Sequence, residues 1–147
     1  MANLTKVTIT INQPVETVWV KLMNPDNLKF WLTGFVSVEQ ISGEIGKTGS
    51  VCKLKFLERG KEMEVTETVV SVIPNQHYTF NMTSTAFNAD TDIRLISFGN
   101  RTEMIQTVQF FPKQFFMKLI MPLIKGAMKK RMENELIRFK NLVEAKS

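Results

Sequence analysis

The chain contains few side chains that could carry nucleophilic or metal chemistry. His77 is its only histidine and Cys52 is its only cysteine. A structural zinc site built from Cys and His ligands is therefore excluded within one chain, and a Ser/His/Asp or Cys/His arrangement would have to use His77. Because His77 follows Asn75 and Gln76 at the start of a predicted strand, we interpret it as a surface histidine. We predict no metal site and no cofactor.

Three carboxylates lie close together in one predicted strand, at Glu62, Glu64 and Glu67. Paired carboxylates can perform general acid–base catalysis, and Glu62 and Glu64 share a face of the strand. With Lys61 beside them, we interpret all three as solvated charges on the sheet surface.

Two short motifs are similar to binding loops but depart from them at required positions. The Gly-Lys-Thr stretch at 46–48 is similar to the end of a phosphate-binding loop, but Ile41 stands where the first glycine is required and a strand follows instead of a helix. The polar stretch 88–92 has the opening spacing of a calcium loop, but Ile93 replaces the required glycine and Gly99 the closing glutamate. We predict neither a nucleotide site nor a calcium site.

The composition is that of an ordinary globular domain. The chain has 147 residues, of which 44% are hydrophobic and 22% charged, and this is enough to bury a core. We expect one domain over residues 1–147. No signal peptide and no apolar stretch of membrane-spanning length are visible, and a single cysteine excludes an internal disulfide. We therefore expect a cytoplasmic protein.

The positive charge is concentrated near the C-terminus. The net charge is +5, and the segment from Lys113 onward carries nine Lys or Arg against three Glu. The excess is consistent with a solvated helix face, or with a surface for an anionic membrane or nucleic acid. Packing explains the aromatic residues Phe115, Phe116 and Phe139 better than stacking on bases does, so we predict no nucleic-acid partner.

The elements that must position these side chains begin with a long C-terminal helix. Apolar residues recur there at spacings of three and four, the period of one helical stripe: Met121, Ile124, Met128, Met132, Leu136, Phe139 and Val143. The pattern predicts a helical region over Lys113–Ala145, in which Pro122 separates a lead-in segment from the long helix.

The upstream sequence predicts short antiparallel strands joined by tight turns. The first strand is followed by two short helices, the first capped by Asn12 and the second at Asn27–Leu32. The predicted strands are Lys6–Ile11, Phe35–Ile41, Val51–Leu57, Lys61–Ile73, His77–Thr83, Asp92–Phe98 and Arg101–Phe111.

Several stretches resemble one known superfamily. The Pro-Val-Glu-Thr-Val-Trp sequence at 14–19 is similar to the start of its first helix, and further matches lie at 24–31, 46–49, 99–102 and 136–144. The chain thus resembles the START-like, or SRPBCC, superfamily, which includes Bet v 1-like proteins and the polyketide cyclase/dehydrase and lipid-transport group. The resemblance implies the α+β helix-grip fold. In it, a curved antiparallel sheet of about seven strands (one strand, two short helices, then six strands) is wrapped on a long C-terminal helix.

The resemblance also implies an apolar cavity between sheet and helix, which the superfamily uses for lipids, sterols, quinones, polyketides and hormones. Methionine can line such an adaptable surface or fill a solid core, and Trp31 could lie in the core or at the cavity mouth. The residues that we expect to contact a ligand are Trp31, Cys52, Leu54, Phe56, Tyr78, Phe80, Met82, Met104, Gln106, Met121, Ile124, Met128 and Met132.

Three functions follow as hypotheses. The first is a carrier or sensor that binds a hydrophobic small molecule, as a monomer or homodimer. The second is an enzyme of the cyclase or dehydratase kind, in which Tyr78, Arg94 or Gln106 orients a substrate carbonyl. The third is an interaction module whose basic helix binds a protein or makes transient contact with a membrane. The segment Lys113–Met132 could form a flap for this contact or simply pack against the rest of the chain.

Overall fold

The computed structural model describes residues 4–145 and contains a seven-stranded sheet with one long C-terminal helix. The elements follow one another in the order β1 (Leu4–Ile11), α1 (Val15–Leu22), the 3-10 helix η1 (Pro25–Asn27), α2 (Leu28–Trp31), β2 (Phe35–Ser42), β3 (Val51–Glu58), β4 (Lys61–Ile73), β5 (His77–Thr83), β6 (Phe87–Ser97), β7 (Thr102–Pro112), α3 (Phe115–Leu119) and α4 (Met121–Glu144).

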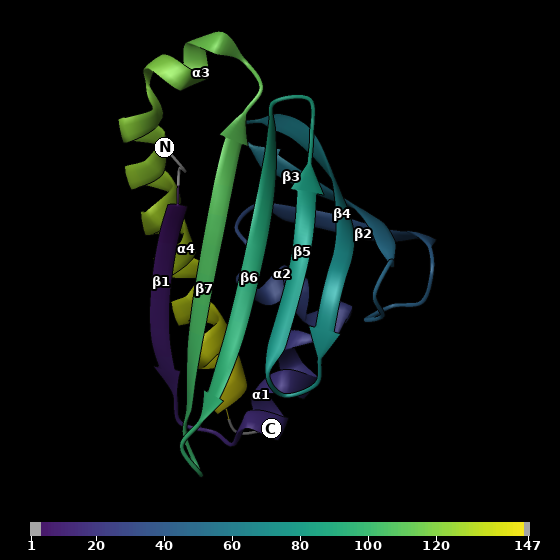
Figure 1. Ribbon diagram of the computed structural model, residues 1–147, viewed down its shortest axis with the longest axis vertical. Coiled ribbons are helices and arrows are strands. Elements are labelled where there is room, and N and C mark those ends of the chain that lie inside the picture. Colours follow the sequence, from purple (N-terminus) through teal and green to yellow (C-terminus); the bar gives the residue numbers. More distant parts are fainter. Residues whose placement is uncertain (1–3, 146–147) are drawn as a thin grey trace.

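All strand pairs in the sheet are antiparallel. The strand order is β1-β7-β6-β5-β4-β3-β2 (Figure 1), so each strand from β2 to β6 pairs with the strand that follows it, and β1 lies at the edge beside β7. This topology confirms the helix-grip prediction. None of the helices within residues 4–145 combines the length and apolarity needed to cross a bilayer.

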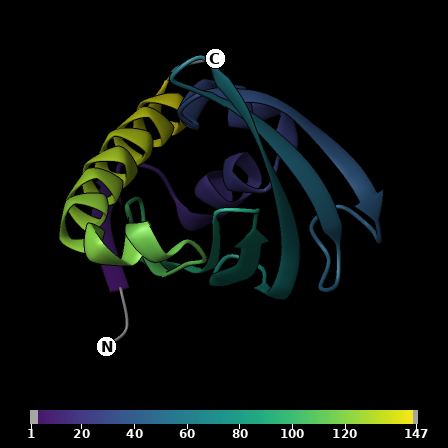
Figure 2. The same ribbon diagram turned by 90° about the horizontal axis from the view of Figure 1, so that it is seen from above.

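The sheet is strongly curved, and α4 lies on its concave side. Seen from above, the sheet curls round the interior with α4 on one side and the β2–β3 pair on the other (Figure 2). Irregular register in β2, and between Val69 and Ser71 in β4, marks places where the strands bend. The curvature sets α4 and these strands on opposite sides of the interior.

Strand alternation determines which side chains face the interior. In one row across the sheet, Gln40 pairs with Cys52, Cys52 with Glu67, Glu67 with Met82, and Met82 with Ala89. Because directly opposed residues project to the same face, the whole row projects to the concave side. The faces predicted for β3 and β5 agree with this arrangement.

The long helix packs its predicted stripe mainly against β1 and α2. Leu136 and Phe139 are fully buried, and α4 begins one residue before Pro122, as the proline predicted. Most of the buried apolar residues form one large cluster, which contains Val7, Ile11, Val15, Val18, Leu22, Trp31, Ala89, Ile93, Leu95, Met104, Val108, Phe110, Met121, Met132, Leu136, Phe139 and Val143. A separate small cluster consists of Leu54, Phe56 and Val65.

Two local predictions were wrong. Strand β6 begins at Phe87, five residues earlier than predicted, because Asn88 and Asp90 find strand partners: the Asn81 Nδ2 donates to Asn88 Oδ1 at 2.8 Å and to Asp90 Oδ1 at 2.9 Å. Asn12 does not cap α1. Its backbone N–H donates instead to Glu144 Oε2 at 2.6 Å, so the connection between β1 and α1 is joined to the end of α4.

Candidate ligand-binding cavity

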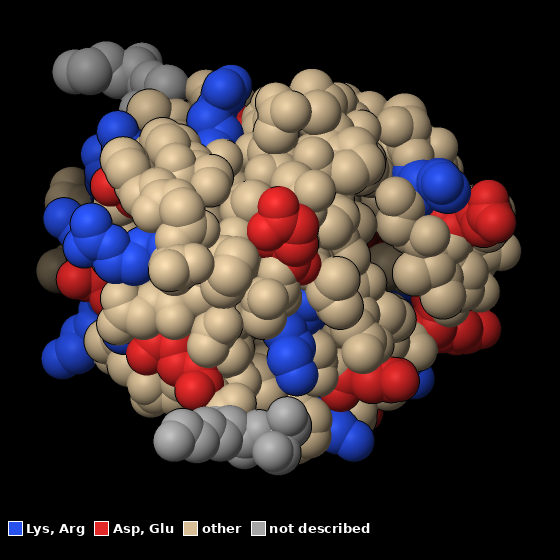
Figure 3. All heavy atoms as spheres, turned by 90° about the horizontal axis from the view of Figure 1, so that it is seen from below, with Lys and Arg blue, Asp and Glu red and all other residues tan. Residues whose placement is uncertain are grey.

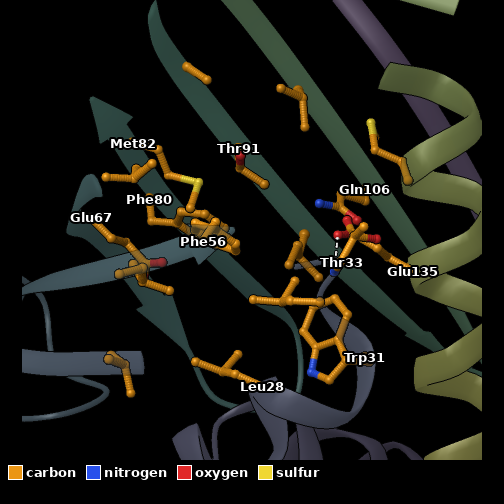
Figure 4. Close-up of a pocket in the computed structure, with 18 of the residues that line it drawn as sticks. Leu28, Trp31, Thr33, Phe56, Glu67, Phe80, Met82, Thr91, Gln106 and Glu135 are labelled. Carbon is orange, nitrogen blue, oxygen red and sulfur yellow. Dashed lines mark hydrogen bonds between the residues drawn. The ribbon is translucent and has the colours of Figure 1, made fainter. Parts of the chain in front are cut away.

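A cavity of about 1040 Å³ lies between the concave face of the sheet and α4. Strands β2 to β7 form one wall, while η1, α2 and the middle of α4 form the other. Figure 4 shows α4 across the cavity from the strands. Its volume is at the upper end of the range usual for small-molecule sites. A molecule with several fused rings or a long chain would fit within it.

The wall is predominantly apolar and rich in aromatic rings. Phe87 stacks on Phe110 with ring centroids 5.1 Å apart, and Tyr78 lies 4.9 Å from Phe80. The apolar side chains of the lining include Leu22, Leu28, Trp31, Leu32, Val38, Leu54, Phe56, Met63, Val65, Val69, Phe80, Met82, Phe87, Ala89, Ile93, Val108, Phe110, Ile124, Met128 and Met132. Such a lining favours apolar ligands through the hydrophobic effect.

Glu67 and Tyr78 form a hydrogen-bonded pair on the sheet side of the cavity. The Tyr78 hydroxyl donates to Glu67 Oε1 at 2.8 Å, and both side chains line the cavity. Figure 4 shows Glu67 among the apolar residues Phe56, Phe80 and Met82. The pair therefore supplies localised polarity within a largely apolar wall.

Burial changes the ionisation of both groups. Desolvation raises the pKa of Glu67 above its ordinary value, although the Tyr78 hydrogen bond opposes the shift. The pKa of Tyr78 is raised first by burial and then by the neighbouring Glu67 carboxylate. Each shift favours the neutral form, so the pair is suited to exchange hydrogen bonds with an uncharged polar group.

Cys52 lies directly opposite Glu67 in the β3–β4 register and also lines the cavity. Burial, followed by the charge of Glu67, raises the pKa of the Cys52 thiol to about 12. Because the thiolate is the nucleophilic form, this cysteine is unsuited to covalent catalysis at neutral pH.

A polar network on the opposite side holds α4 against the turn after α2. The Thr33 backbone N–H donates to Glu135 Oε2 at 2.8 Å, and Arg131 Nη2 donates to the Thr33 carbonyl at 2.9 Å. Arg138 donates from Nη2 to Thr33 Oγ1 at 2.5 Å and from Nε to the Trp31 carbonyl at 3.1 Å. We call Thr33, Arg131, Glu135 and Arg138 the α4 clamp.

Most residues predicted to contact a ligand line this cavity. The exceptions are Met104 and Met121. Met104 projects from the predicted face of β7 but is completely covered within the large cluster. Met121 is buried beside a shallow depression formed with Phe111 and Pro112, outside the main cavity. Both methionines are packing residues, since neighbours cover their inward faces.

Of the three side chains proposed to orient a carbonyl, Tyr78 and Gln106 line the cavity and Arg94 does not. The placement of Arg94 is a correction. Ile93 and Leu95 project inward, so Arg94 between them projects outward, where its Nε lies 3.4 Å from Asp92 Oδ2. His77 Nε2 also pairs with Asp92 Oδ1, at 2.5 Å.

Trp31 lies in the core, one of the two positions that the sequence left open, and also lines the cavity. Its side chain is buried in the large cluster, where its ring lies 5.0 Å from that of Phe139, and it also contributes to the cavity wall. Its ring therefore lies between the large cluster and the cavity.

Sequence reasoning missed the inward position of Glu67. The interpretation as a solvated charge was wrong for it, because it alternates in phase with Met63, Val65 and Val69, which all line the cavity. This two-residue period was the available signal. The same period places Thr91 in the cavity wall.

The interpretation was correct for the other two carboxylates. Glu64 lies 3.3 Å from Lys53 and Glu62 lies 3.7 Å from Lys55, in ion pairs on the solvated face. Within residues 4–145, no group of three or more His, Cys, Asp or Glu side chains is arranged to hold a metal ion.

A family model described as polyketide cyclase/dehydrase and lipid transport matches residues 4–144. No curated protein shows a significant match to the chain. Solved structures are similar over nearly the whole length. An aromatase/cyclase from a Streptomyces species has a TM-score of 0.82 and 14% identity, covering 98% of this chain and 94% of that one.

Two further structures show the same breadth of likeness. A START superfamily protein from Mycobacterium smegmatis has a TM-score of 0.81 and 12% identity, covering 96% of this chain and 97% of that one. Norcoclaurine synthase from Thalictrum flavum has a TM-score of 0.73 and 14% identity, covering 100% and 96%. At these identities the likeness shows a shared fold and no shared activity.

Proposed function

The chain belongs to the polyketide cyclase/dehydrase and lipid-transport family, within the START-like superfamily, and on this premise we propose that it carries or senses a hydrophobic small molecule. The observation that supports this function best is the cavity of about 1040 Å³, with its apolar lining and its buried Glu67–Tyr78 pair. Apolar walls contribute affinity, while a few fixed polar groups determine orientation.

The pair also indicates the chemistry of the ligand. With Tyr78 donating to Glu67 Oε1, a protonated Glu67 has its own O–H available for an acceptor. The ligand that fits is therefore mainly apolar and carries a carbonyl, ether or hydroxyl oxygen. A charged carboxylate group fits poorly beside Glu67, because the cationic side chains of the lining, Lys130, Arg131 and Arg138, all belong to α4.

The first experiment is native mass spectrometry of the freshly purified protein, followed by extraction and identification of any released molecule. A direct binding assay can then use prodan, a neutral naphthalene dye with one carbonyl group. Prodan fluoresces at shorter wavelength in apolar surroundings, so we expect a blue shift and saturable binding at one site. Absence of both a copurifying molecule and saturable prodan binding would contradict the proposal.

The variant Met128→Trp tests whether the dye enters the cavity. Met128 lines the cavity from α4, so a larger indole there should obstruct the site and weaken prodan binding at least about tenfold. Ile137→Trp is the matched control, because Ile137 is exposed on α4 and does not line the cavity. Equal affinities of the two variants would place the dye elsewhere.

A cyclase or dehydratase is the second candidate, and the same Glu67–Tyr78 pair favours it. A neutral carboxyl can donate a proton to a substrate oxygen, and a nearby phenol can orient the carbonyl. The test is incubation with a poly-β-ketone substrate analogue and mass-spectrometric detection of a product that has lost water. Turnover that Glu67→Gln abolishes would favour the enzyme over the carrier.

A further inference from the structure

Helix α3 and the first turn of α4 expose an unusual amount of apolar surface. Phe115 is 73% exposed, Leu119 70% and Leu123 75%, and Phe116 and Ile120 are also exposed. Figure 1 shows that α3 lies at one end of the molecule, beyond the strand ends. We call these five residues the apolar corner. The packing interpretation of this segment is therefore wrong for its outward half.

The inward half of the same segment is packed normally. Met121 is buried, and Met117, Ile124 and Met128 pack against the large cluster. These inward residues pack against the core, so the five residues of the apolar corner are not needed for that packing. Contiguous exposed apolar surface of this kind commonly marks a site that binds another protein, a membrane or a ligand.

The sequence that forms the apolar corner is basic and lacks acidic residues. Lys118, Lys125, Lys129 and Lys130 are exposed, and the sequence from Met104 to Met132 contains no Asp or Glu. Within residues 4–145, none of these four lysines forms an ion pair. At the opposite end of the molecule, by contrast, acidic and basic side chains are interspersed (Figure 3).

The charge pattern discriminates among possible occupants of the corner. In a two-fold contact with a second copy, each basic surface would face the same basic surface, which is repulsive. An anionic surface is complementary to the lysines. Large apolar side chains on a short helix at the end of a molecule can insert between lipid headgroups, while lysines remain at the headgroup level.

We propose that the apolar corner docks on an anionic lipid bilayer. Phe115, Leu119 and Leu123 insert at the boundary between headgroups and acyl chains, and the lysines contact lipid phosphates. In the turns that follow Leu123, Ile124 and Met128 line the cavity. Docking would therefore hold the α4 wall of the cavity close to the lipid. The inference rests on the surface alone and does not depend on which molecule occupies the cavity.

Vesicle cosedimentation tests the docking. We expect binding to vesicles of phosphatidylcholine that contain roughly one-third phosphatidylglycerol, and weak binding to phosphatidylcholine alone. The double variant Lys125→Glu, Lys129→Glu should weaken the partition at least about tenfold. The matched control is Lys47→Glu with Lys61→Glu, which changes the net charge equally at exposed lysines elsewhere. An equal loss in both double variants would overturn the assignment to this surface.

Insertion is tested separately from electrostatic attraction. In the variant Leu119→Trp, the new indole should be quenched by brominated lipid, whereas in Phe98→Trp it should not be. Phe98 is exposed in the turn between β6 and β7, and this turn lies at the end of the molecule opposite α3 (Figure 1). Binding without selective quenching at 119 would overturn the insertion step. Absence of binding to anionic vesicles would overturn the whole proposal.

Two measurements distinguish the remaining occupants. Light scattering of the free protein would show a dimer if a second copy covers the corner, and a dimer that Leu119→Ser dissociates would overturn membrane docking. The surface variants should bind prodan with unchanged affinity, because the replaced side chains of Leu119, Lys125 and Lys129 do not line the cavity. Failure of docking and failure of ligand binding are thus separable outcomes.

Discussion

Glu67 is the residue at which burial and chemistry meet in this molecule. Its carboxyl lies in an apolar wall, with the Tyr78 hydroxyl as a hydrogen-bond partner and Cys52 opposite it in the sheet. Desolvation raises the pKa of Glu67 because the charged form loses more hydration than the neutral form. A residue held in this way makes the stability of the fold depend on pH.

The pH dependence has a definite sign. Because the pKa of Glu67 is higher in the folded chain than in the unfolded chain, the folded state binds this proton more tightly. The contribution to the free energy of unfolding is fully present below the unfolded pKa and is lost as the pH rises through the folded pKa. Glu67→Gln removes the titration while keeping an acceptor for Tyr78, so its unfolding free energy should fall less over this range.

Urea unfolding of both proteins from about pH 4 to about pH 9 measures this difference in slope. Glu64→Gln is the control, since Glu64 lies on the solvated face of the same strand beside Lys53. Its slope is the reference for the loss of a carboxyl from this strand outside the cavity. If the unfolding free energies of Glu67→Gln and the wild type change with pH in parallel, Glu67 titrates as an exposed carboxyl. It then cannot serve as the neutral donor of a hydrogen bond to the ligand.

At the residue scale, most of the residues predicted to contact a ligand do line the cavity, but the prediction covered only part of the wall and missed Glu67. Alternation alone brought out Leu54, Phe56 and Met82, because a strand has only two faces. It could equally have brought out Glu67, but side-chain charge was given more weight than phase. Arg94 was misplaced because its ability to orient a carbonyl was given more weight than the strand alternation. Ile93 and Leu95 project inward, so the residue between them projects outward.

At the scale of the secondary-structure elements, the α4 clamp holds α4 in place on the rest of the fold. Hydrogen bonds join Arg131, Glu135 and Arg138 of α4 to Thr33 in the turn after α2. Glu135 is nearly buried, and Arg131 Nε lies 3.5 Å from its carboxylate. The clamp fixes the helix wall of the cavity relative to Trp31.

Glu135→Ala should lower the free energy of unfolding by about 1–3 kcal/mol, because it leaves the Thr33 N–H without its acceptor and the Arg131 guanidinium without one of its carboxylates. Glu133→Ala is the control two residues earlier, at an exposed position of the same helix. Urea unfolding at neutral pH measures both. A loss no larger than that of the control would show that the clamp adds nothing to the attachment of α4.

At the element scale, periodicity predicted the long helix and nearly all strand bounds, since local hydrophobic pattern determines both. Periodicity could not predict the α4 clamp. Thr33 and Glu135 are 102 residues apart, and neither carries a local pattern that selects the other as a partner. The early start of β6 was missed for a related reason, because the outward Asn88 is accommodated by Asn81 on another strand.

On the scale of the whole molecule, the packed core is unequally divided around the cavity. The large cluster joins β1, β6 and β7 to α1 and α4, whereas the small cluster holds only Leu54, Phe56 and Val65 on β3 and β4. Leu28, Leu32 and Phe87 pack against both clusters. The side of the sheet that carries the small cluster therefore has less buried apolar surface to stabilise it.

Hydrogen exchange should resolve this inequality, because amides protected by few buried contacts exchange through partial opening. We expect the amides of Leu54 and Val65 to exchange at least about tenfold faster than that of Val108, which lies in the large cluster. Saturating prodan should slow β3 and β4 selectively, since a ligand that contacts both walls stabilises the closed state by mass action. Uniform protection without the dye would show a single cooperative core. Slowing confined to β1 and β7 would place the ligand outside the cavity.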